Sequence, residues 1–215
     1  MSLSINPVRS AKNNNANNNK NNFNIQTTEA IYIDSINGND QNSGKLLKKA
    51  FMTIQCASRH FHDSMTVYVR TGEYYNHNFD IETNLKNKPP IIRITNTKNI
   101  EIKNFPGHLP KLFYDGLLGI EIVNSTNVQV SGFEISSRAA KNINETTIFS
   151  IKNSKNVKII ENLIDGCDPT RIDQFNGKIP NNNNSDNIFI NIDDSSRRII
   201  TKNNTFTKSE LECET

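Results

Sequence analysis

A short segment of this chain is repeated at a fixed interval. NSTNVQVSGFEI runs from Asn124 to Ile135, and NSKNVKIIENLI runs from Asn153 to Ile164, 29 residues later. The wider pattern appears as IRITNTKNIEI, IEIVNSTNVQV and FSIKNSKNVKI, with a weaker fourth copy in FINIDDSSRRIIT. Each copy indicates a strand, an Asn-containing turn and a second strand. A period of this length is typical of a solenoid with one coil per repeat.

Apolar residues alternate along the strands of each copy. Because successive side chains of a strand point to opposite sides, the apolar set lies on one face. Aligned copies place equivalent residues inside: Ile120, Ile122, Val128, Val130 and Ile135, then Phe149, Ile151, Val157, Ile159 and Ile164. We expect these columns to stack into a core that no single repeat could bury alone.

Asparagine recurs at the turn between the two strands. Asn99, Asn127 and Asn156 occupy the same place in successive copies. A tight corner between short strands needs a residue at positive φ, which Asn tolerates best after Gly. Stacked amides can also hydrogen-bond along a ladder parallel to the solenoid axis. We therefore interpret these asparagines as architectural.

The composition agrees with many short strands and turns. Roughly one residue in six is Asn and aromatic residues make up 7% of the chain, which does not suit a helical bundle because Asn favours turns. The net charge of +3 is small and the basic residues are scattered, so neither nucleic acid nor a membrane is an expected partner. Cys56, Cys167 and Cys213 lie far apart in no metal-binding spacing, which argues against a disulfide framework or a zinc site.

The chain divides into a polar tail and one domain. Residues 1–28 include KNNNANNNKNNFN, which has almost nothing to bury, and are predicted to form a disordered Asn-rich tail. Residues 29–215 are predicted to form the repeat domain, with a long loop at about 165–187. Residues 2–16 lack the apolar core of a signal peptide, and no apolar run reaches membrane-spanning length. A soluble intracellular protein is the default expectation.

An ordered set of short motifs opens the domain. They are Ile31–Asp34, Asn37–Asp40, Ser43–Gly44, Phe51–Gln55 and Thr66–Tyr74. In this order they resemble the opening of right-handed parallel β-helix proteins of the pectate-lyase-like superfamily, where a short helix caps the solenoid. The resemblance covers about 45 residues, and the repeats extend it to about residue 206. This chain departs from the pattern at Lys49–Ala50, where a proline is usual, and before Thr66, where Gly-Asp is usual.

The repeats and the resemblance predict one fold. It is all-β, a single-stranded right-handed parallel β-helix (solenoid) with a short N-terminal capping helix. The apolar stripe of that helix is Phe51, Ile54, Ala57 and Phe61, spaced by three and four residues. Only about four or five coils fit in the sequence. Two interpretations of this short solenoid stay open: a truncated relative of a longer family, or end-to-end self-association through the uncapped C-terminal coil, since an open strand edge invites association.

The resemblance implies one possible chemistry. Polyuronate lyases of this superfamily act by β-elimination, in which carboxylate-bound Ca²⁺ neutralises the substrate and a Lys or Arg removes a proton. The matching inventory lies in the long loop: Asp165, Asp168 and Asp173 as metal ligands and Arg171 or Lys178 as the base. Residues predicted to bind substrate on the adjacent strands are Glu121, Lys152 and Asn191. A solvated loop with ordinary turn aspartates is the competing interpretation.

Two functions of different class remain open. The first is a β-helix without catalysis, which binds carbohydrate or has a structural or interaction role. The second is a calcium-dependent polysaccharide lyase that uses residues 165–178. A polysaccharide is the expected partner in both the carbohydrate-binding and the lyase hypotheses, and Ca²⁺ is the expected cofactor in the second.

Overall fold

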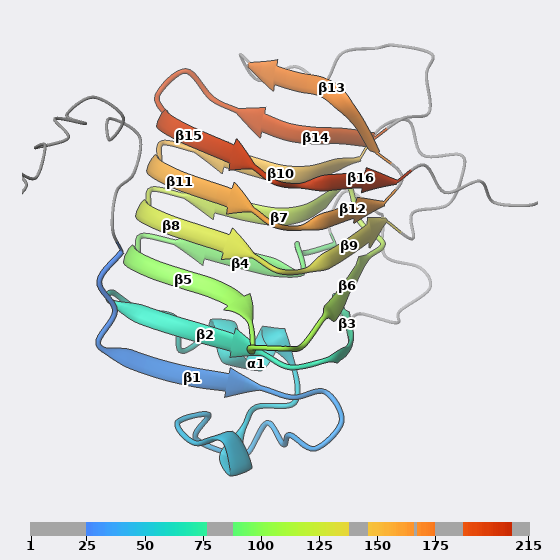
Figure 1. The fold of residues 1–215 in the computed structure, drawn as a ribbon. Helices are drawn as coiled ribbons and strands as arrows, with labels where there is room; N and C mark the ends of the chain where they lie inside the picture. Colours follow the sequence, from blue (N-terminus) through green and yellow to red (C-terminus); the bar gives the residue numbers. More distant parts are fainter. Residues whose placement is uncertain (1–24, 77–87, 138–145, 166, 175–186, 208–215) are drawn as a thin grey trace, which may run out of the picture.

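The computed structural model is a right-handed parallel β-helix (Figure 1). It describes residues 25–76, 88–137, 146–165, 167–174 and 187–207. Three parallel sheets form the walls of the solenoid, and each full coil contributes one strand to each sheet. The predicted all-β solenoid is therefore confirmed.

The three sheets are named here in the order in which a coil visits them. Sheet A contains β1 (Glu29–Ile33), β2 (Met65–Val69), β5 (Lys98–Asn104), β8 (Thr126–Ser131), β11 (Lys155–Ile160) and β15 (Arg197–Lys202). Sheet B contains β3 (Gly72–Tyr75), β6 (Pro110–Tyr114), β9 (Glu134–Ser137), β12 (Leu163–Asp165) and β16 (Thr205–Thr207). Sheet C contains β4 (Ile92–Thr95), β7 (Leu118–Val123), β10 (Thr147–Lys152), β14 (Asn187–Ile192) and β13 (Cys167–Gln174).

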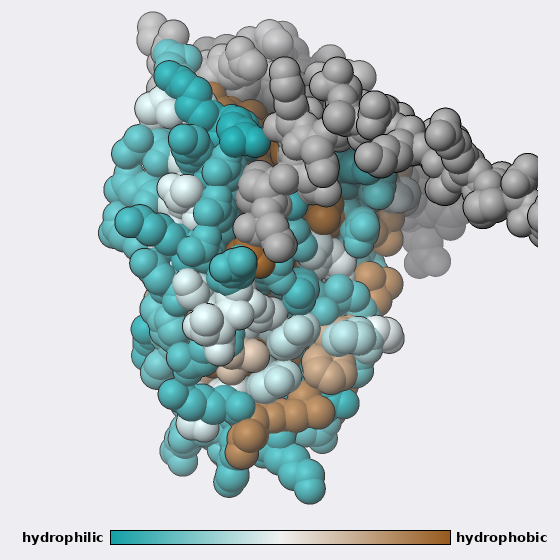
Figure 2. Space-filling view, turned by 60° about the vertical axis from the view of Figure 1, so that its left-hand side comes forward, coloured by the Kyte–Doolittle hydropathy of each residue, from teal (hydrophilic) through white to brown (hydrophobic). Residues whose placement is uncertain are grey.

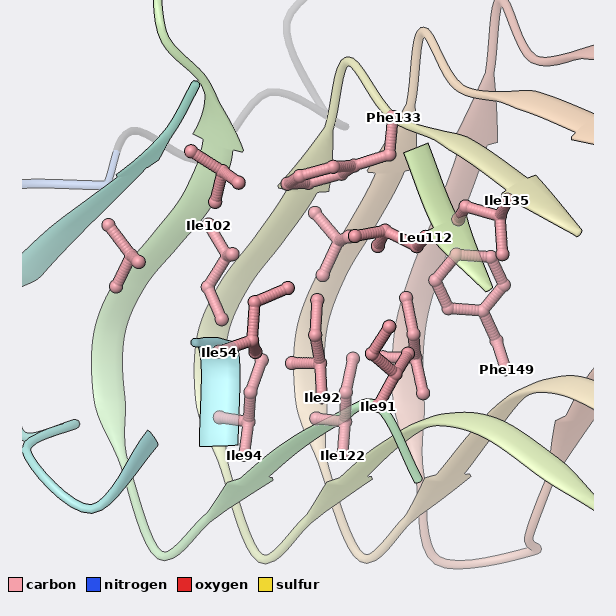
Figure 3. Packing of buried hydrophobic residues seen from close by; sticks show 14 of the residues in the cluster. Ile54, Ile91, Ile92, Ile94, Ile102, Leu112, Ile122, Phe133, Ile135 and Phe149 are labelled. Carbon is pink, nitrogen blue, oxygen red and sulfur yellow. The ribbon is translucent and has the colours of Figure 1, made fainter. Parts of the chain in front are cut away.

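The strand register follows the sequence repeat. Ile120 pairs with Phe149, Val128 with Val157, and Ile135 with Ile164. Residues at the predicted inward positions of both copies are fully buried. Figure 3 shows Ile122, Ile135 and Phe149 among the side chains that fill the space between the sheets, together with Ile54 from the capping helix. Stacking of like residues buries a core along the whole axis, as the repeat predicted.

The predicted asparagine ladder is confirmed at the corner between sheets C and A. Asn99, Asn127 and Asn156 have φ values of 58°, 57° and 57°. The Nδ2 atoms of Asn127 and Asn156 donate to the Oδ1 atoms of Asn99 and Asn127, each at 2.7 Å. The side chain that permits the left-handed conformation thus also links one coil to the next.

Two further columns reinforce this corner. Asn96, Asn124 and Asn153 form a second ladder, with φ values of 54°, 51° and 45° and amide hydrogen bonds of 3.2 and 2.8 Å. Between the ladders, the buried hydroxyls of Ser125 and Ser154 accept from the backbone N–H groups of the preceding coil. Their hydroxyls also donate to carbonyl oxygens two residues earlier, so these buried polar groups are satisfied.

The last described coil departs from the ladder. Arg198 occupies the position after Asn156 and keeps a positive φ of 58°. Asn156 Oδ1 is buried, and no hydrogen-bond partner for it lies among the described residues. Asp193 closes the turn instead: it accepts from the N–H of Asn153 at 2.9 Å and from Ser196 Oγ at 2.6 Å. Burial opposes ionisation of Asp193, but these hydrogen bonds outweigh it and lower the pKa.

Residues 34–61 cap the N-terminal end of the solenoid. The predicted amphipathic helix is confirmed but shorter: α1 spans Ile54–Ser58, and a 3₁₀ turn, η1, spans Leu47–Lys49. Backbone bonds from Tyr32 to Gly44 and from Phe51 to Tyr32 satisfy the outer edge of β1. Because this edge is covered by the chain itself, sheet A does not begin with an open strand.

Other predicted segments have mixed outcomes. Most of the predicted tail, residues 1–24, lies outside the described residues, while Ile25 is buried and Thr27 accepts a hydrogen bond from Thr66 at 2.7 Å. The loop prediction is wrong for residues 167–174, because they form β13 against β14. Residues 175–186 lie outside the described part. Sheets A and B end at β15 and β16 among described strands, and self-association through this end stays a prediction.

Candidate functional site

The residues predicted to bind substrate share one wall of the solenoid. Glu121 and Asn191 lie in one outward row of sheet C, because each is the register partner of Ser150 on β10. Lys152 Nζ is 3.2 Å from Glu121 Oε1, and Arg93 Nε is 2.8 Å from Glu121 Oε2. The Glu121 side chain is only 13% exposed. Glu121 therefore links three coils by ion pairs, and its role in substrate binding stays a prediction.

The residues predicted to hold calcium are divided between two walls. Asp165 lies on β12 of sheet B and accepts a hydrogen bond from Thr207 Oγ1 at 2.8 Å. Asp168 and Asp173 lie on β13 of sheet C, where Asp173 is the register partner of Asn191. Among the side chains that the structure describes, which exclude those of residues 166–188, no group of three or more metal-ligating residues is close enough to hold a metal ion.

Of the two residues predicted to act as the catalytic base, the structure describes one. Arg171 lies on β13, at the irregularity of register between Asp168 and Ile172. Lys178 lies outside the described residues. The structure therefore brings Arg171, Asp168 and Asp173 to one strand, and the catalytic roles remain predictions.

A cluster of aromatic rings lies on the outward face of sheet A and was not predicted. This sheet A platform consists of Tyr32, Tyr68, Phe105 and His108. Tyr32 and Tyr68 are register partners on β1 and β2, and their rings stack at 5.6 Å between centroids. Phe105 tilts against both, at 6.3 and 5.7 Å, and His108 packs edge-on against Phe105 at 5.3 Å. All four residues are half-buried, so part of each remains accessible.

One ion pair lies directly beside this platform. Lys103 Nζ lies 5.4 Å from the centroid of the Tyr68 ring, which is within cation–π range. The same ammonium group pairs with the Glu101 carboxylate on the outward face of β5. The platform therefore combines ring surface with a hydrogen-bond donor, the Lys103 ammonium, and an acceptor, the Glu101 carboxylate.

Hydrogen bonds fix the corner between sheets A and B next to the platform. His108 Nδ1 accepts from the N–H of Thr71 at 2.9 Å, and Asn104 Nδ2 donates to the His108 carbonyl at 2.6 Å. The N–H of Leu109 donates to Thr71 Oγ1 at 3.1 Å. Because Nδ1 is an acceptor, the neutral His108 ring carries its proton on Nε2. Two successive coils are thus tied together at this corner.

A second aromatic pair lies around that corner. Tyr75 on β3 and Phe113 on β6 stack at 5.3 Å with their planes 19° apart, and are named here the sheet B stack. The hydroxyl of Tyr75 donates to the carboxylate of Glu73. A hollow of about 140 Å³ adjoins Tyr75 and is also lined by Ser35, Thr53, Gln55 and Glu73.

The floor of the hollow is held by a buried polar network. The Tyr74 hydroxyl donates to the Arg70 carbonyl at 2.9 Å and accepts from the N–H of Ser35 at 3.1 Å. Burial raises the pKa of Tyr74. Burial opposes ionisation of Asp34, but bonds from Asn37 and Ile36 and the nearby Arg70 guanidinium lower the pKa of this carboxyl. The network holds the capping segment against the first coil.

Hydrophobic side chains also gather near the capping end. In the view of Figure 2, brown side chains concentrate toward the lower part of the molecule, while the rest of this face is largely hydrophilic. Large exposed hydrophobic residues among those described are Ile36, Leu46, Leu47, Met52 and Leu109. Met52 lines the hollow and Leu109 lies at the corner between the aromatic groups. The accessible apolar surface of the described chain therefore lies mainly in its first coils.

The sequence contained a partial signal for the sheet A platform. In Ile31–Tyr32–Ile33 and Val67–Tyr68–Val69, the tyrosines alternate with buried aliphatic residues and so must face outward. Phe105 gave no such signal, because it follows β5 in a corner segment. Contact between rings from three coils depends on the register, which the sequence pattern did not supply.

Comparisons with known proteins give one structural similarity. No protein-family model matches the sequence, and no curated protein sequence matches it. A solved rhamnogalacturonan lyase structure is similar to this chain with a TM-score of 0.44 and 16% identity. The match covers 65% of this chain and 39% of that lyase chain. Within the described residues, no helix has the length and apolar character needed to cross a membrane.

Proposed function

We propose that this protein binds carbohydrate on the outward face of sheet A. The observation that supports this most strongly is the platform of Tyr32, Tyr68, Phe105 and His108, assembled from three coils. Aromatic rings carry negative charge on their faces, which attracts the weakly positive C–H groups on the apolar side of a sugar ring. Lys103 and Glu101 lie beside the rings and supply a donor and an acceptor for sugar hydroxyls.

The platform differs from the rest of the outer surface in kind. On sheet C, the outward residues Arg93, Glu121 and Lys152 satisfy one another as ion pairs. On sheet A, Ile31 and Val67 face inward and fill the core, and their neighbours Tyr32 and Tyr68 present their rings on the outer surface. Outward aromatic residues next to polar side chains are a common composition for recognition surfaces.

Affinity electrophoresis or calorimetry on a panel of neutral and acidic polysaccharides would test this proposal. Tyr68→Ala and Phe105→Ala each remove one ring, and we expect affinity to fall by roughly two- to tenfold, since a ring contact contributes about 0.5–1.5 kcal/mol. Thr95→Ala, at an exposed position on β4 of sheet C, is the control and should bind like the parent. Failure of the parent protein to bind any polysaccharide, or equal loss in all three variants, would contradict the proposal.

A second candidate function is calcium-assisted β-elimination on a uronate polysaccharide. One observation favours it: β13 places Asp173 beside Asn191, in the row that also holds Ser150 and Glu121. Asp168 and Asp173 would be the ligands of calcium, whose chemistry is to neutralise the substrate carboxylate, and Arg171 would act as the base. Asp165 fits this set less well, because it belongs to sheet B.

The lyase candidate has its own assay. Unsaturated uronate products absorb in the ultraviolet, so pectin, alginate and chondroitin can each be tested with calcium present. Activity that Arg171→Ala abolishes would support it, and calcium-dependent thermal stabilisation that Asp168→Ala removes would support the metal site. Absence of product on all three substrates would exclude lyase activity on these polymers.

A further inference from the structure

Two aromatic groups lie on either side of one corner of the solenoid. Tyr68 on β2 and Tyr75 on β3 belong to the same coil, joined through the segment that contains Arg70 and Thr71. Phe113 on β6 follows the corner segment 105–109 of the next coil, which supplies Phe105 and His108 to the sheet A platform. The sheet B stack is therefore built from two of the three coils that form the platform, and the two groups follow one another along the chain path (Figure 1).

The corner between them is rigid and has apolar surface of its own. Thr71 is bonded to both His108 and Leu109 of the neighbouring coil. The Leu109 side chain is 48% exposed. A ligand that leaves the platform over His108 therefore meets Leu109 first. It then crosses the outward pair Glu73 and Lys111 before it reaches Phe113.

The hollow adjoins Tyr75 of the sheet B stack and is small, and Met52 and Ile54 lie beside the polar residues of its lining. Its 140 Å³ is below the roughly 300–1,000 Å³ of a site that encloses a whole small molecule. It can thus accept one end of a ligand whose remainder lies outside. Glu73 is exposed at its rim and already accepts from Tyr75, while Gln55 is oriented by a 2.6 Å bond to the Tyr75 carbonyl.

The charges along this path favour a neutral ligand. Three basic residues lie beside it, and each is paired with a carboxylate: Lys103 with Glu101, Arg70 with Asp34 and Lys111 with Glu134. The exposed carboxylate at the hollow is that of Glu73. A polyuronate would bring further negative charge to this end, where it would be repelled.

We propose that the sheet A platform, Leu109, the sheet B stack and the hollow form one continuous track for a neutral oligosaccharide, running around the solenoid rather than along its axis. The inference rests on the proposed function and extends it. The platform binds the middle of the saccharide chain, and the hollow receives its end. The two ring groups then act as linked subsites, so longer saccharides gain affinity from the second subsite without a new intermolecular association step.

Calorimetry with neutral xylo-, cello- and malto-oligosaccharides, from disaccharide to octasaccharide, tests the track. Binding by the parent protein should tighten with length by about 100-fold or more, the gain expected for two linked subsites. Phe113→Ala should remove roughly five- to tenfold of the octasaccharide affinity and leave the disaccharide unaffected. Tyr68→Ala should weaken both. Thr95→Ala on β4 of sheet C, an exposed position outside every proposed site, is the control, and thermal melts of every variant establish that it is folded.

The possible outcomes distinguish a failure of the track from a failure of the proposed carbohydrate-binding function. Length-independent affinity, or octasaccharide binding unchanged in Phe113→Ala, overturns the track while the platform keeps its proposed function. Tighter binding of oligogalacturonate than of any neutral series overturns the neutral specificity. If no saccharide of any length binds, the proposed function fails, and the track fails with it.

Discussion

Two corners of the solenoid are built in opposite ways. At the corner between sheets C and A, each coil repeats the same residues, and Asn99, Asn127 and Asn156 bond to one another in a column. At the corner between sheets A and B, the coils differ, and Thr71 and His108 bond to each other as unlike residues. Repetition suits stacking, because every coil presents the same partner to the next. The irregular corner carries the candidate ligand surface.

The difference indicates where selection for a ligand can act in a repeat protein. A change at Asn127 disturbs the coils on both sides, since its amide donates to Asn99 and accepts from Asn156. A change in an outward ring leaves the ladders and the core intact. Three substitutions and one change of pH test this difference between the corners, and they are given in order of decreasing expected effect.

The largest effect is expected at Gly132, which lies against Asn104 of the preceding coil at the corner between sheets A and B. Gly132 has a φ of 78°, and a Cβ atom there would lie 2.1 Å from Asn104 Oδ1. We expect Gly132→Ala to lower the free energy of unfolding by about 3 kcal/mol, from left-handed strain and overpacking. Asn104 must also move and release the His108 carbonyl. Chemical denaturation measures the loss, and an unchanged midpoint would contradict this account.

Asn127→Ala tests the repeated corner alone. The substitution removes two amide hydrogen bonds and places Ala at a φ of 57°. We expect a loss of about 2 kcal/mol, since Asn99 and Asn156 each lose a partner in a part-buried site. Asn127→Gly is the matched control, because it tolerates the backbone and lacks only the hydrogen bonds. If Asn127→Ala and Asn127→Gly lower the free energy of unfolding equally, backbone strain at this position does not contribute to the loss.

Arg198→Asn should have the opposite sign. It extends the ladder into the last described coil, where the buried Asn156 Oδ1 lacks a hydrogen-bond partner among the described residues. The positive φ of 58° at this position already suits Asn. We expect stabilisation of about 1 kcal/mol, the net contribution of one hydrogen bond. A lower melting temperature than that of the parent would show that the Arg198 side chain contributes more than the ladder bond.

The smallest effect is expected from acid. Hydrogen bonds to Asp193 lower the pKa of this carboxyl in the folded state, against the opposing effect of burial. Its contribution to stability is therefore present above the unfolded-state pKa and is lost as the pH falls through the folded-state pKa. Melting temperatures recorded from neutral pH into acid should decline, and the decline should be shallower for Asp193→Asn. Parallel curves for the two proteins would refute this linkage.

The candidate site was far less predictable than the fold. The Asp residues of the predicted calcium site are close in sequence, yet the chain turns from sheet B to sheet C between Asp165 and Asp168. Proximity along the chain therefore did not place these residues on one wall of the solenoid. In contrast, Tyr32 and Tyr68 are far apart in sequence and stack directly, because the capping segment between them returns the chain to the next rung of sheet A.

The sequence by itself determined the coil. Its alternating aliphatic residues defined the inward faces, its asparagines defined a corner, and the repeat interval defined the length of each turn, because all three are local patterns within one coil. The tertiary structure alone decided which outward side chains meet. That outcome depends on the register between coils and on the non-repeating cap, so it brought Phe105 onto the tyrosines, formed β13 from an expected loop and divided the predicted calcium ligands between two walls.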